Sequence, residues 1–288
     1  MTGLAIRITG VMLRATALAV LLAGPAMAQD AGSGRVGPEA LDRLPRADVV
    51  LLGEVHDNAA HHLMQARAIG AIKPVALVFE MLTPERAAQV PADRSDAATV
   101  EAALGWNASG WPDFAMYHPI FLAAPKARIY GGDVPRADIR VALDFGAAQA
   151  FGAEAGRYGL NADLPATERA AREEEQAVAH CRALPLNMLP GMVEAQRLRD
   201  ASLAQAVVQA LAETGGPVVV ITGAGHARRD RGVPAVLALA APDASVLSLG
   251  LLEEVAEVEG LFDLWIITGV PDGPGRGDPC AAFGQQKA

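Results

Sequence analysis

Two short segments place a histidine three residues after a glycine: Gly53-Glu-Val-His56 and Gly223-Ala-Gly-His226. Each follows a short apolar run directly, and so does Glu80. Two imidazoles with nearby carboxylates can bind a divalent metal, or can act as a general base held by an orienting carboxylate. We therefore predict a metal site of His56, Glu80 and His226, or a catalytic site that also includes Glu54. The alternative is that both histidines only bond loop backbones.

Six short apolar runs, at residues 49–53, 75–79, 127–130, 217–221, 245–249 and 263–267, indicate strands that are covered on both faces. Helical patterns lie between the first four of these runs, at 59–72, 84–89, 99–104, 113–124 and 136–149. This alternation predicts an α/β fold with a mainly parallel sheet flanked by helices. Ligands bind such sheets at the carboxyl ends of the strands. The two Gly-x-x-His turns and Glu80 should therefore meet at one edge.

Residues 143–214 contain no strand candidate and hold two long helical patterns, at 166–181 and 188–213. We predict a small all-helical subdomain here, inserted into an α/β domain of residues 47–142 and 215–270. The alternative is two ordinary crossover helices packed on the sheet.

Other polar residues lie near the predicted strand ends. Arg136 and Arg228 follow two of the strands, and either could steady an anionic group if the site is catalytic. His61 and His62 begin the helical pattern at 59–72 and are expected to be solvated rather than ligating.

The first 28 residues have the layout of a secretory signal peptide. Two arginines precede an apolar run at residues 15–24, which is followed by Pro25 and Ala26-Met-Ala28. The run is shorter than the ~20 residues that a membrane-spanning helix needs. We expect cleavage after Ala28, a polar leader over residues 29–46, and a periplasmic or secreted product with no transmembrane segment.

Composition excludes several classes of protein. The chain has 288 residues, of which 51% are hydrophobic and 20% are charged, which excludes a disordered chain. Loss of the signal would change the net charge from −9 to −11, which disfavours a nucleic-acid partner. In an oxidising compartment we predict a disulfide between Cys181 and Cys280 that ties down a Gly/Pro-rich tail of residues 271–288. Two free thiols are the alternative.

A series of motifs resembles the ChaN-like family of haem-binding uptake proteins, within the Tiki/erythromycin-esterase/TraB superfamily. The resemblance covers residues 47–267, nearly all of the predicted mature chain. In sequence order the motifs are Gly53-Glu-Val-His56 with His61-His62, Val78-Phe-Glu-Met81, Trp111-Pro-x-Phe-x-x-Tyr117-x-Pro119, Asp133-Val-Pro-Arg136, Gln196-x-x-x-Asp200 and Gly223-Ala-Gly-His226.

The resemblance implies an exported protein of iron or haem acquisition, in which a tyrosinate holds haem and a homodimer can stack two haems between its subunits. Candidate haem ligands are Tyr117, Tyr158, which we expect to be exposed, and His180 in the helical segment. No cysteine lies near the predicted cleavage point to accept a lipid. The superfamily also contains metal-dependent hydrolases, so such an enzyme, using the paired Gly-x-x-His site, is the alternative function. Whether the protein is an enzyme stays open.

Overall fold

The structure is a computed structural model that describes residue 1, residues 34–254, residues 258–270 and residues 280–281. The predicted signal peptide, the first residues of the predicted leader and most of the predicted tail lie outside the described residues. The residues from Gly34 onward belong to one compact unit.

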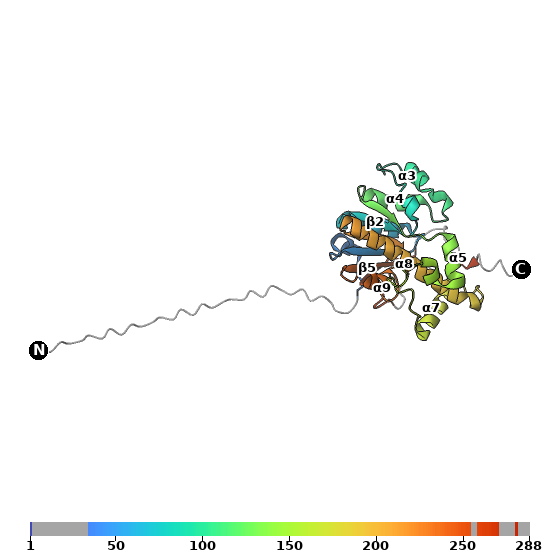
Figure 1. The fold of residues 1–288 in the computed structure, drawn as a ribbon. Helices are drawn as coiled ribbons and strands as arrows, with labels where there is room; N and C mark the ends of the chain where they lie inside the picture. Colours follow the sequence, from blue (N-terminus) through green and yellow to red (C-terminus); the bar gives the residue numbers. More distant parts are fainter. Residues whose placement is uncertain (2–33, 255–257, 271–279, 282–288) are drawn as a thin grey trace. The chain divides into compact units, whose positions relative to one another are not determined.

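In the described residues, six strands form one sheet whose neighbouring strands all run parallel, in the order β3-β2-β4-β1-β5-β6 (Figure 1). The strands are β1 (Val49–Glu54), β2 (Ala76–Phe79), β3 (Arg128–Gly131), β4 (Val218–Gly223), β5 (Val246–Leu252) and β6 (Leu264–Ile267). All six match the apolar runs, and the predicted α/β class with a parallel sheet is confirmed. Gly53 pairs with Thr222, so β1 and β4 end side by side.

The α-helices are α1 (Ala59–Ile72), α2 (Pro84–Ala87), α3 (Ala97–Leu104), α4 (Phe114–Ala123), α5 (Arg136–Phe145), α6 (Ala147–Phe151), α7 (Ala166–Ala179), α8 (Leu189–Thr214) and α9 (Val233–Ala240). Shorter 3-10 helices are η1 (Pro38–Arg43), η2 (Trp106–Ala108) and η3 (Leu186–Met188). The single helix predicted at 136–149 is wrong: Gly146, at φ 92°, separates α5 from α6. A residue with that φ cannot continue a right-handed helix.

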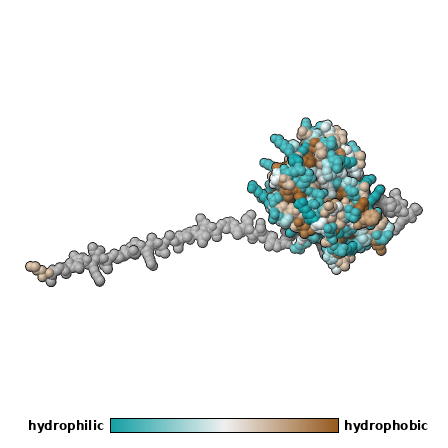
Figure 2. Space-filling model, viewed as in Figure 1, coloured by the Kyte–Doolittle hydropathy of each residue, from teal (hydrophilic) through white to brown (hydrophobic). Residues whose placement is uncertain are grey.

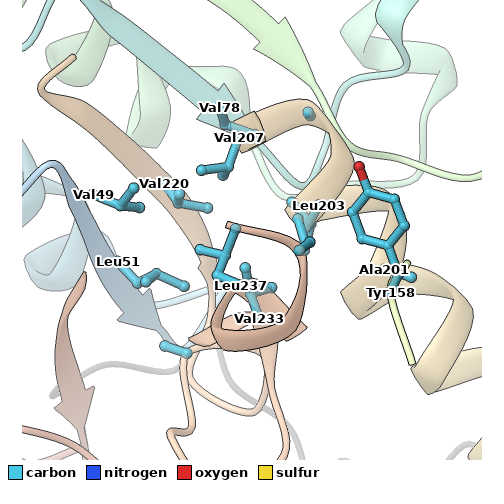
Figure 3. Packing of buried hydrophobic residues seen from close by; sticks show 14 of the residues in the cluster. Val49, Leu51, Val78, Tyr158, Ala201, Leu203, Val207, Val220, Val233 and Leu237 are labelled. Atoms are coloured by element: carbon cyan, nitrogen blue, oxygen red, sulfur yellow. The ribbon is translucent and has the colours of Figure 1, made fainter. Parts of the chain in front are cut away.

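A hydrophobic core lies on each face of the sheet, because successive side chains of a strand point to opposite faces. In β1, Val49 and Leu51 join one core with α8 and α9 (Figure 3), while Val50 and Leu52 join the other with α1 and α4. Both faces are covered, which explains why the strands read as continuous apolar runs.

Helix α8 links the helical segment to the sheet. Leu203 and Val207, in its C-terminal half, lie in the same core as Val78 and Val220 of the sheet (Figure 3). Helix α7 packs against α8. The C-terminal half of α8 therefore shares a core with the sheet.

The ends of the compact unit are held by contacts far apart in sequence. Cys181 and Cys280 form the expected disulfide, with their Cα atoms 5.5 Å apart. In the predicted leader, Val36 N donates to Trp265 O at 2.9 Å, and Leu41 is buried. Among the described residues, none of the helices combines the length and the apolar character that crossing a membrane requires. Figure 2 shows hydrophilic side chains around separate hydrophobic patches on one face.

Candidate functional site

Glu54, the last residue of β1, is buried at the centre of a polar cluster. Its Oε1 atom accepts hydrogen bonds from Tyr117 OH at 3.0 Å and from His56 Nδ1 at 2.9 Å. Burial by itself would raise the pKa of Glu54, but hydrogen bonds from His56 and His62 outweigh it and hold that pKa below its usual range. Glu54 is therefore a buried carboxylate whose charge is balanced by imidazoles.

His61 and His62 are fully buried, so the expectation that they are solvated is wrong. The first turn of α1 folds back over the turn that follows β1, because Asn58 caps the helix by accepting from Ala60 N. His62 Nε2 donates to His56 O at 2.9 Å, and its Nδ1 lies 3.0 Å from Glu54 Oε2. Both ring nitrogens face acceptors, and Glu54 raises the pKa of His62 against the effect of burial.

Glu80 follows β2 and bridges the other two strand ends. Its Oε2 atom accepts from Thr222 Oγ1 and from Gly223 N, each at 2.7 Å. Its Oε1 atom lies 3.5 Å from His226 Nε2 and 3.9 Å from His56 Nε2. The two Gly-x-x-His turns therefore do meet at one edge of the sheet, with Glu80 between their histidines.

His226 is held from its other side by Asp200 of α8, whose Oδ1 atom accepts from Nδ1 at 2.7 Å. Burial by itself would lower the pKa of His226, but Glu80 and Asp200 outweigh it and raise that pKa to about 9. At Asp200 the effect of burial is larger than that of His226, so the pKa of this carboxyl is raised. The sequence analysis placed Asp200 in a motif of the family resemblance but gave it no role at the site, because it lies on a helix remote in sequence.

The cluster is thus a row in which carboxylates and imidazoles alternate. In spatial order its members are Asp200, His226, Glu80, His56, Glu54 and His62. Such a row can hold buried charge, because each charged group has a partner of opposite sign beside it. The described residues hold no group of three or more His, Cys, Asp or Glu placed to bind a metal ion, so a divalent metal is not supported.

A cleft of about 430 Å³ opens beside this row, between the ends of β1 and β4 and the helices α7 and α8. Its lining includes His56, whose side chain is 32% exposed, and His226. Arg228 lines the cleft, as the sequence suggested, whereas Arg136 is exposed and outside that lining. Arg172 and Arg231 also line the cleft. Arg231 lies in the same loop as Arg228 and was open to prediction, but no local signal pointed to Arg172.

The tyrosines expected as haem ligands are buried. Tyr117 lies in the core with its OH on Glu54, and both burial and that carboxylate raise its pKa. The expected exposure of Tyr158 is wrong, because its ring packs against Phe151 in the core shared with Leu203 (Figure 3). The remaining tyrosine, Tyr130, is also buried.

His180 lies directly after the last residue of α7 and is partly exposed. Its Nδ1 donates to Gln176 O at 2.8 Å. Of the three residues expected to hold haem, it is the one whose side chain reaches the surface.

Comparisons with known proteins give one family and one fold. A family model described as "Haem-binding uptake, Tiki superfamily, ChaN" matches residues 40–237. The solved structure described as cofacial haem binding to ChaN of Campylobacter jejuni is similar with a TM-score of 0.59 at 19% identity, covering 79% of this chain and 88% of that one. The type III effector HopBA1 gives a TM-score of 0.44 at 11% identity, covering 77% and 88%. No curated protein matches the sequence.

Proposed function

Because the chain belongs to the ChaN family of haem-binding uptake proteins in the Tiki superfamily, we propose that it binds haem outside the cytoplasm as part of iron acquisition. The observation that carries this proposal is the family match over residues 40–237, which include the candidate site and the helical segment. The similar fold of a protein described with bound haem agrees with it.

A tyrosinate ligand does not fit this chain. A phenol binds iron as a tyrosinate, and each of the three tyrosines is buried. Burial raises the pKa of both Tyr117 and Tyr158, which disfavours the anion. In addition, ligation by Tyr117 would break its hydrogen bond to Glu54 inside the core.

His180 fits the role of axial ligand better. Imidazole is a common haem ligand. Its Nδ1 donates to the Gln176 carbonyl, so Nε2 is the ring nitrogen that would ligate iron. A backbone bond of this kind also fixes the orientation of the ring. On this proposal, His180 Nε2 would be the axial ligand of the haem iron.

Apolar side chains near His180 in sequence are exposed, as a macrocycle with apolar faces requires. Val178, Leu186 and Met188 are 56%, 79% and 42% exposed. They belong to the end of α7 and to η3, on either side of the disulfide at Cys181. Exposed apolar residues that gather in one segment of a soluble protein indicate a binding surface.

Export is supported by the disulfide, because such bonds persist in oxidising compartments. We propose a periplasmic or secreted mature chain that begins at residue 29. The intact mass of protein purified from the culture's periplasmic fraction tests this: a mass that includes residues 1–28 would contradict cleavage.

Titration with haemin tests haem binding. The wild type should give a saturable Soret shift, and His180→Ala should weaken it by at least tenfold, since a lost ligand bond outweighs about 1.4 kcal/mol. The matched control is His118→Ala on α4, which should leave the shift unchanged. Absence of a shift in the wild type would overturn the proposal, whereas a normal shift in His180→Ala would overturn only the ligand. Light scattering with and without haem tests the expected homodimer.

Metal-dependent hydrolysis, the alternative function, is not better supported, since the described residues lack a group placed to hold a metal.

A further inference from the structure

Two arginines of the cleft share one carboxylate. Arg228 Nη1 lies 3.3 Å from Glu175 Oε1, and Arg231 Nη2 contacts Glu175 Oε2. Both arginine side chains are largely buried, while Glu175, on α7, is 49% exposed. The carboxylate thus approaches the pair from the exposed side, whereas the two guanidinium groups belong to the wall of the cleft.

The guanidinium of Arg228 is oriented before any ligand arrives. Asp230 accepts from its Nε at 2.9 Å and from its Nη2 at 2.6 Å, which is a bidentate pair. The remaining nitrogen, Nη1, is the one that contacts Glu175. A fixed guanidinium that offers one edge to a carboxylate loses little entropy on binding.

Other donors face the same cavity. The Nε2 atom of His56 lies 3.9 Å from Glu80 Oε1, which is beyond hydrogen-bond distance, and the side chain is part-exposed in the cleft lining. The cavity also lies at the carboxyl ends of β1 and β4, where ligands of parallel sheets bind. A second polar group of a ligand would therefore meet His56 Nε2.

His180 lies just beyond two residues of α7 that line the cleft. Arg172 and Gln176 line it, and His180 follows at the same spacing of four residues along α7. Side chains four apart lie on one face of a helix, and Gln176 O accepts from His180 Nδ1. A ligand on the exposed surface near His180 could therefore extend a carboxylate into the cleft.

We propose that Arg228 and Arg231 form a carboxylate-binding subsite, in which the carboxylate of a small organic acid displaces that of Glu175. Two sources of this chemistry are distinguishable, namely a free organic acid and the propionate groups of haem. Only the second source rests on the proposed function.

The first experiment titrates the purified protein with citrate in a calorimeter. Glu175→Gln removes the internal competitor and should bind citrate about tenfold more tightly, whereas Arg231→Gln should bind about tenfold more weakly, as expected when one charged hydrogen bond is gained or lost. Glu213→Gln is the control, because this exposed glutamate pairs with Arg128 outside the cleft. Circular dichroism checks that each variant is folded.

The second experiment compares haem with its dimethyl ester, which lacks the propionate charges. If haem is the source, the wild type should bind the ester at least tenfold more weakly than it binds haem. The ester should also bind equally well to the wild type and to Arg231→Gln. If haem does not bind at all, the proposed function fails and the citrate titration alone decides the subsite. The subsite is overturned if Glu175→Gln and Arg231→Gln bind citrate as the wild type does and the ester binds as well as haem.

Discussion

Three carboxylates and three imidazoles stand in one largely buried row at the end of the sheet, and their charges balance when all are ionised. A buried charge is tolerated only where it is paired. Removing one member would leave its neighbour buried and unpaired, so each member constrains the rest. This balance gives the row a dependence on pH.

Stability should fall as the pH rises through the pKa of His226. That folded-state pKa is raised to about 9 from an ordinary value of 6.5. A raised histidine pKa contributes stability that is fully present below pH 6.5 and is lost between that pH and about 9. The free energy of unfolding in urea should drop by up to about 3 kcal/mol over this window.

His226→Gln should remove most of that drop, while His118→Gln, outside the row, should keep it. An equal drop in the wild type and His226→Gln would contradict the assignment. The pKa values of His56 and His62 are also raised, so a smaller slope of the same sign should persist in His226→Gln.

Tyr117→Phe separates a structural tyrosine from a haem ligand. The change removes the OH that bonds Glu54 at 3.0 Å, but His56 still donates to the same carboxylate oxygen. We expect a loss of about 1 kcal/mol in the free energy of unfolding and an unchanged Soret shift with haemin. Disappearance of that shift in a folded variant would restore Tyr117 as the ligand.

Part of the site could be predicted from the sequence. His56, Glu80 and His226 each lie within three residues of the end of a strand, so a parallel sheet brings them together by its topology alone. Asp200 comes from α8 and reaches His226 only through helix packing. The burial of His62 likewise depends on how α1 returns over β1, and nothing local in the sequence specifies that return.

At the scale of elements, the close approach of β1 to the turn after β4 requires glycine at position 53. A Cβ there would lie 2.8 Å from the Ala227 Cβ and 2.9 Å from the Ala224 Cα in the turn after β4. Gly53→Ala should therefore lower stability by about 1–3 kcal/mol through overpacking, and displace that turn. Urea unfolding of the variant measures the loss.

Gly70→Ala on α1 is the matched control. No atom lies within 4 Å of the added Cβ, and the position is exposed inside a helix. Alanine should raise stability there by about 0.5–1 kcal/mol, because glycine loses more backbone entropy in a helix. Equal effects at the two positions would contradict the contact at Gly53.

The strands were easier to predict than some helices, for a physical reason. Strands covered on both faces are apolar along their whole length, which the sequence displays directly. Helix α9 was missed because its segment, Val233–Ala240, is short and almost wholly apolar, without the polar face that marks a surface helix. The break at Gly146 depends on backbone geometry that a helical pattern does not reveal.

At the scale of the whole molecule, the disulfide joins residues 99 positions apart, at the turn between α7 and η3. Cys181 and Arg182 both have a positive φ, at 57° and 52°, in a region that side chains disfavour. The crosslink therefore holds a turn that is unfavourable by itself, next to the proposed haem ligand His180.

Removing both cysteines should lower the stability of the whole compact unit. Cys181→Ala with Cys280→Ala releases a long loop in the unfolded chain, and such a loss typically costs about 2–5 kcal/mol. Urea unfolding of the double variant measures this, and the wild type in excess reductant should match it, because the two lack the same crosslink. A stability equal to that of the oxidised wild type would contradict the role of the bridge. If the double variant also binds haemin more weakly in the absence of urea, the disulfide holds His180 in place.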